Sequence, residues 1–91
     1  MFRYKSGISL DYDRQGYVYF LSKNYKILPP WDQEKIRNLC CMVGRQYWKA
    51  VLEFVTTDAN ATYIEHRHNI SKATLYRMVR SYYEEFPDPR V

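Results

Sequence analysis

The residues of this 91-residue chain whose types and spacing most clearly indicate a binding function are the cations between positions 66 and 83. Four of them, Arg67, Lys72, Arg77 and Arg80, occur in this stretch without a single Asp or Glu. The whole chain carries 14 Lys and Arg against 10 Asp and Glu, which gives a net charge of +4. Because a local run of uncompensated cations attracts phosphate groups, the stretch predicts a surface for an anionic partner.

Other residues that could do chemistry have simpler interpretations. His66 and His68 would lie about 200° apart on a helix, so they cannot bind one metal ion together. Glu84 and Glu85 come directly before the proline-rich C-terminus, where no cleft would raise a carboxyl pKa for acid–base catalysis. The chain has no phosphate-binding loop, nucleophile elbow or zinc-protease motif. We therefore expect no enzyme activity, metal, cofactor or small-molecule substrate.

Residues 61–85 have the pattern of a helix-turn-helix motif. The apolar residues that would pack its two helices together are Ile64, Ile70, Leu75 and Val79. Asn69 falls at the turn position that needs a left-handed backbone, where Asn is among the best substitutes for glycine. Ser71 is a good N-cap for the second helix. Glu65 departs from the pattern, which usually has Ala or Gly there, and indicates a register error of one residue or a wider angle between the helices.

The outer face of the second motif helix is the candidate contact surface. With Leu75 at the centre of the buried face, Ala73, Arg77 and Arg80 fall on the opposite side at 100° per residue. Small side chains near the helix start would allow close approach to a nucleic-acid groove. The residues that we expect to contact DNA are Arg67, His68, Ser71, Lys72, Thr74, Tyr76, Arg77 and Arg80. Arg67 and His68 would bind the phosphate backbone. The alternative is that these cations form an ordinary solvated helix face.

Leu28-Pro29-Pro30 divides the chain into an N-terminal arm, residues 1–27, and a helical DNA-binding domain, residues 28–91. In the arm, the aromatic run Tyr17–Leu21 predicts one short strand. Tyrosines crowd the arm, at positions 12, 17, 19 and 25. They would either cover the helical core or form an interface between subunits.

Two helices are predicted between the prolines and the motif. The first has Asp32 as its N-cap, Trp31 stapled against Ile36, and Gly44 at its end. The second starts at Arg45 and stops at the polar residues 56–58. The expected fold is therefore all-α, a helix-turn-helix bundle of about four helices with an irregular aromatic N-terminal arm.

Cysteine usage and hydropathy indicate the compartment. Cys40 and Cys41 are adjacent on a predicted helix, about 100° apart, so we expect two reduced thiols with Cys40 on the buried side. The apolar run Tyr17–Leu21 is far too short for a signal peptide or a membrane span. We expect a soluble, cytoplasmic, nucleoid-associated protein with no membrane partner.

The segment from about Leu28 to Met78 resembles the PapB-type regulators of bacterial fimbrial (adhesin) operons. The likeness lies in an inward aliphatic run, then the stretch Trp48–Val55, then Ile64, Ile70 and the helix from Ser71. It covers somewhat over half of the chain, and residues 1–27 hardly at all. The resemblance implies a small cytoplasmic transcription regulator that acts as an oligomer on AT-rich DNA upstream of pilus genes, with contacts through the minor groove.

The sequence thus predicts a protein that binds double-stranded DNA selectively, as a homo-oligomer, to regulate transcription. A single module of this size with four or five cations would bind DNA weakly at physiological salt, which favours self-association. Two alternatives stay open. The chain could be a helical protein-interaction module, an adaptor or antagonist that binds no DNA. It could also be the DNA-binding piece of a transposase or recombinase, which a start at Met1 and the lack of room for a catalytic domain disfavour.

Overall fold

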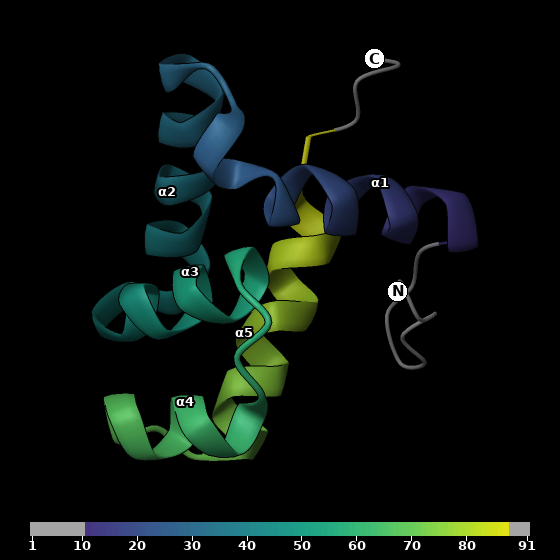
Figure 1. The fold of residues 1–91 in the computed structure, drawn as a ribbon. Helices are drawn as coiled ribbons and strands as arrows, with labels where there is room; N and C mark the ends of the chain where they lie inside the picture. Colours follow the sequence, from purple (N-terminus) through teal and green to yellow (C-terminus); the bar gives the residue numbers. More distant parts are fainter. Residues whose placement is uncertain (1–10, 88–91) are drawn as a thin grey trace.

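The computed structural model describes residues 11–87, which form five α-helices and, within that range, no strand. The helices are α1 (Tyr12–Lys23), α2 (Pro30–Gly44), α3 (Trp48–Thr56), α4 (Ala61–His68) and α5 (Lys72–Glu85). Short 3₁₀ turns, η1 (Tyr25–Ile27) and η2 (Arg45–Tyr47), precede α2 and α3. The predicted all-α class is confirmed. In Figure 1, α1 and α4 lie at opposite ends of α5, and α3 crosses between them.

One apolar core joins all five helices. Its buried side chains are Val18 from α1; Ile36, Leu39 and Cys40 from α2; Ala50, Val51 and Val55 from α3; Ala61 and Ile64 from α4; Ile70 from the turn; and Leu75, Val79, Tyr82, Tyr83 and Phe86 from α5 and its end. Cys40 is fully buried and Cys41 is exposed, as the helical spacing predicted. No helix in the described range is long and apolar enough to cross a bilayer.

The N-terminal arm differs from its prediction. Residues 12–23 form α1, so the predicted strand at Tyr17–Leu21 is wrong and this part of the arm is helical rather than irregular. The buried positions of α1 are Gln15, Val18 and Ser22, which follow a helical period. Two of these three side chains are polar, so the apolar pattern of the sequence hides that period. Residues 1–10 of the predicted arm lie outside the described range.

The arm tyrosines do not all serve one purpose. Tyr17 packs edge-on against Phe86, with ring centroids 6.0 Å apart, and Tyr25 packs against the core and accepts a hydrogen bond from Arg37 at 2.8 Å. Tyr12 is 58% exposed. Covering the core is therefore the role of at least two of them.

The start of α2 also differs from its prediction. The helix begins at Pro30 with Pro29 as its N-cap, so Asp32 is a first-turn residue and not the cap. Proline is well suited to the first helical position, because its missing N–H would have no partner there. Trp31 is the second residue of the helix and 65% exposed, so it does not occupy the position before the N-cap from which a hydrophobic staple to Ile36 would form.

Candidate nucleic-acid interface

The geometry of α4, its turn and α5 follows the predicted helix-turn-helix. Ile64, Ile70, Leu75 and Val79 are each at most 3% exposed. Burial of four aliphatic side chains between two short helices contributes several kcal/mol, at about 1.5–3 kcal/mol for each side chain. These four side chains therefore hold α4 and α5 together.

The turn between the helices has the backbone that the sequence predicts. Asn69 adopts the left-handed conformation, with φ 53° and ψ 51°, and its N–H bonds the carbonyl of Glu65. The side chain of Asn60 caps α4 by accepting a hydrogen bond from Tyr63 N at 2.8 Å. Because Asn69 lies at the left-handed position, the register of the motif is correct, and the half-buried Glu65 does occupy the usual Ala or Gly position.

Ser71 and Thr74 serve the start of α5. Ser71 Oγ accepts a hydrogen bond from Thr74 N at 3.2 Å and donates one to Thr74 Oγ1 at 2.9 Å. The Thr74 hydroxyl keeps its own hydrogen, so it can still donate to an acceptor outside the chain. Ser71, predicted as both cap and contact, therefore has its hydroxyl engaged in capping.

The outer face of α5 carries three exposed cations. Lys72, Arg77 and Arg80 are solvent-exposed, and none of them forms an ion pair with a carboxylate of residues 11–87. α1 packs near the other end of α5, where Tyr17 meets Phe86, and these three side chains stay solvent-exposed. Such cations are available to bind phosphate without first breaking an internal contact.

Tyr76 lies at the edge of the same face. It is 54% exposed, and its ring packs edge-on against Phe54 of α3 with centroids 6.2 Å apart. The contact fixes one side of the ring and leaves its other side accessible to a base or sugar.

Arg67 and His68 do not join the α5 face. Both bind Glu53 of α3: Arg67 Nε lies 3.0 Å and His68 Nε2 lies 2.7 Å from the same carboxylate oxygen. The structure thus engages two of the predicted backbone-binding residues in a contact within the chain. Sequence reasoning missed Glu53, because nothing local in α3 indicates which distant helix its side chain meets.

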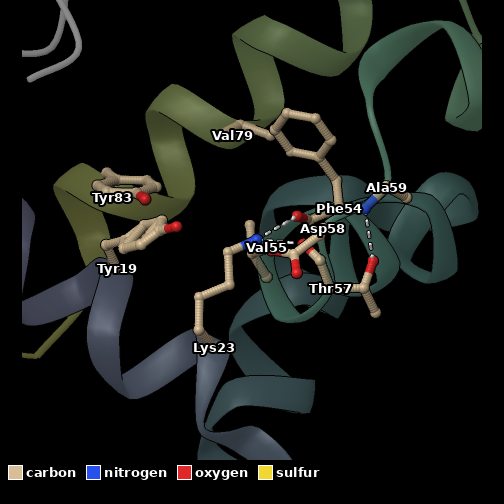
Figure 2. Close-up of a pocket in the computed structure, with 9 residues that line it drawn as sticks. All are labelled: Tyr19, Lys23, Phe54, Val55, Thr57, Asp58, Ala59, Val79 and Tyr83. Carbon is tan, nitrogen blue, oxygen red and sulfur yellow. Dashed lines mark hydrogen bonds between the residues drawn. The ribbon is translucent and has the colours of Figure 1, made fainter. Parts of the chain in front are cut away.

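A cavity of about 170 Å³ lies between α1, α3 and α5. In Figure 2, Lys23 reaches from α1 toward the end of α3, with Tyr19 and Tyr83 on one side of it and Phe54 on the other. The Lys23 ammonium donates to the carbonyls of Thr57 and Phe54, the latter at 3.4 Å, and lies 5.3 Å from the Tyr19 ring centroid. Helix C-termini carry partial negative charge, so Lys23 stabilises the end of α3 and holds α1 against it.

Metal-ligand geometry is not found in the described part of the chain. No three His, Cys, Asp or Glu side chains of residues 11–87 come close enough together to hold an ion.

Comparison of the chain with models of protein families, with curated proteins and with solved structures found no match. The resemblance to the PapB-type family therefore stays a prediction that depends on the sequence pattern.

Proposed function

We propose that this protein binds double-stranded DNA through the outer face of α5 and regulates transcription. The observation that carries the proposal is the set of three exposed cations on that face, Lys72, Arg77 and Arg80, none of which is paired with a carboxylate of residues 11–87. They follow a left-handed Asn turn and a capped helix start, the arrangement by which helix-turn-helix proteins present a reading helix.

The dimensions and charge of α5 suit this role. A helix of 14 residues is about 21 Å long, and the major groove of B-DNA is wide enough to accept an α-helix. Each phosphate neutralised by a cation contributes roughly −0.9 to the slope of log K against log salt concentration. Three contacts per chain would give a slope of about −2.7.

Oligomerisation belongs to the same proposal. Three phosphate contacts support only weak binding at physiological salt, so useful occupancy requires two or more copies on neighbouring half-sites. Sedimentation of the free protein and of its DNA complex tests this point, and a complex with one chain per duplex would contradict it.

Substitution of Arg77 tests the contact surface. We expect Arg77→Ala to weaken binding to a short AT-rich duplex by about 1–3 kcal/mol, measured by fluorescence anisotropy at low salt. The melting temperature should change little, since Arg77 is exposed and unpaired within residues 11–87. Lys35→Ala on α2 is the matched control, because it removes the same charge from an exposed residue on another helix.

Two results would contradict the proposal. Equal losses in the Arg77 and Lys35 variants would mean that only net charge matters. Absence of any wild-type binding at low salt would exclude the DNA-binding function.

The proposal about which genes the protein regulates depends on the PapB resemblance alone. It implies fimbrial operons, AT-rich sites and a nucleoid location. Sequencing of the genomic DNA that copurifies with the protein tests all three, and recovered fragments with no enrichment of AT-rich or adhesin-operon DNA would contradict them.

A protein-interaction module is the second candidate. Large apolar side chains are exposed on α1, η1 and α2: Phe20 is 57%, Ile27 80%, Trp31 65% and Met42 57% exposed. Exposed apolar side chains favour contact with another protein surface. This candidate replaces the first if low-salt gel shifts show no DNA complex.

A further inference from the structure

We propose that Glu53 is a positioning residue for the DNA-binding surface, because it holds α4 against α3 and so fixes the N-terminal end of α5. The inference rests on the proposed DNA-binding function and adds a residue that does not itself lie on the contact face.

The contact is a three-residue cluster at the end of α4. One oxygen of the Glu53 carboxylate accepts hydrogen bonds from Arg67 Nε at 3.0 Å and from His68 Nε2 at 2.7 Å. Because an ionised carboxylate only accepts, His68 must carry a proton on Nε2. Beside the cluster lies Tyr63, whose ring centroid is 6.0 Å from the Arg67 guanidinium carbon.

Burial separates this cluster from an ordinary surface ion pair. The side chains of His68 and Glu53 are only 20% and 24% exposed, whereas that of Arg67 is 57% exposed. Exposed pairs contribute little because solvent screens them and side-chain entropy opposes them. The His68–Glu53 bond is short and partly shielded, so its geometry is restrictive.

These bonds are the only side-chain hydrogen bonds that join α3 to α4 in the described range. The buried side chains of α3 and α4 are all apolar, and apolar burial is not directional. A hydrogen bond requires both a distance and an angle. Glu53 therefore sets the rotation of α4 relative to α3, which apolar packing between these two helices leaves less well defined.

The position of α4 determines the position of the start of α5, because the connection between them is very short. Only residues 69–71 separate the two helices, and Asn69 is fixed in the left-handed conformation. At its other end α5 is anchored to α1, since Tyr82 bonds Ser22 at 2.6 Å. Lys72 lies ten residues, or about 15 Å, from that anchor, so a tilt of about 10° moves it by about 2.6 Å. A hydrogen bond between Lys72 and a phosphate would be lost at much smaller displacements than this.

General electrostatics and a positioning role of Glu53 predict opposite changes in DNA affinity, so one substitution can distinguish them. Glu53→Gln removes a negative charge from a protein that would bind a polyanion, so general charge effects should strengthen binding. If Glu53 positions α5, the same substitution should weaken binding roughly three- to tenfold. Glu34→Gln, on the exposed side of α2, is the matched control for charge and should not weaken binding.

The experiment measures duplex affinity by anisotropy well below the melting temperature, together with amide hydrogen exchange of the free protein. We expect Glu53→Gln to speed exchange in the first turn of α5 and the last turn of α4, and to leave α1 and α2 unchanged. A merely stabilising role would speed exchange throughout the molecule. Glu53→Asp keeps the charge on a shorter side chain, should fall between wild type and Glu53→Gln, and decides the question if the Gln variant does not fold.

The outcomes separate this inference from the proposed function. If wild type binds DNA and the Gln variant binds as tightly or more tightly, Glu53 has no positioning role, and the proposed function stands. If wild type binds no DNA, both ideas are overturned.

Discussion

At the scale of single residues, the strained backbone after α2 falls on Arg45 and not on the neighbouring Gly44. Arg45 has φ 51° and ψ −118°, a conformation that only glycine adopts easily, while Gly44 before it is in the ordinary helical region. Gly44 packs closely against α3: a Cβ there would lie 3.1 Å from Val51 Cγ2, a tight contact that Val51 would have to relieve by moving slightly. The sequence predicted that α2 ends at Gly44, and it does, but the residue with the positive φ at this end is Arg45 and not the glycine.

This strain predicts a stabilising substitution. Arg45→Gly should raise the free energy of unfolding by about 1 kcal/mol, because relief of the strain exceeds the extra entropy of the unfolded chain. The melting temperature should rise by about 4–8 °C in thermal unfolding. Arg45→Ala removes the same charge but keeps a Cβ, so a comparable gain in that control would show that charge, and not backbone strain, is responsible.

At the scale of elements, α1 is the helix that sequence reasoning missed. It was missed because its buried face consists of Gln15, Val18 and Ser22, and polar side chains carry no apolar period. By contrast, the turn after α4 and the N-cap of α5 were predicted, since Asn69 and Ser71 act on neighbouring backbone groups. Local signals therefore predicted the motif, and only tertiary contacts explain α1.

The polar bond that attaches α1 to α5 gives an asymmetric prediction. Ser22 donates its one hydroxyl hydrogen to the Val18 carbonyl at 2.7 Å, so Tyr82 must be the donor in the 2.6 Å bond to Ser22. Ser22→Ala leaves a fully buried Tyr82 hydroxyl without its acceptor and should destabilise the protein by about 1–3 kcal/mol. Tyr82→Phe should cost less, about 1 kcal/mol, since no unpaired donor remains.

Urea unfolding of both single variants and the double variant measures this asymmetry. The double variant should lose less stability than the sum of the two single variants. Equal costs with full additivity would mean that the two hydroxyls do not interact.

At the scale of the whole molecule, burial links stability to alkaline pH. Burial raises the pKa of the Cys40 thiol from 9.0 to about 12, and burial also raises the pKa of Tyr82 and Tyr83 above their ordinary value of 10.0. All three groups are neutral in the folded protein and ionise more easily when the chain unfolds. Their contribution is therefore complete below pH 9 and is lost as the pH rises toward 12 and beyond.

We expect the melting temperature to be constant from neutral pH to about pH 9 and to fall steeply above it. Cys40→Ala removes the earliest of the three ionisations, so in that variant the fall should begin nearer pH 10. A melting temperature that stays constant to pH 11 would show that these groups are not shielded from solvent.

The amino-acid sequence by itself determined the all-α class, the approximate span of the helix-turn-helix over residues 61–85, the left-handed turn at Asn69 and the cationic run after it. Each of these depends on residues close together in the chain, which interact in the same way whatever surrounds them. Tertiary structure decided that α1 is a helix, that the carboxylate of Glu53 binds Arg67 and His68, and that Lys72, Arg77 and Arg80 stay unpaired within residues 11–87. Those outcomes depend on which distant side chains meet in the folded chain, and no local pattern encodes such meetings.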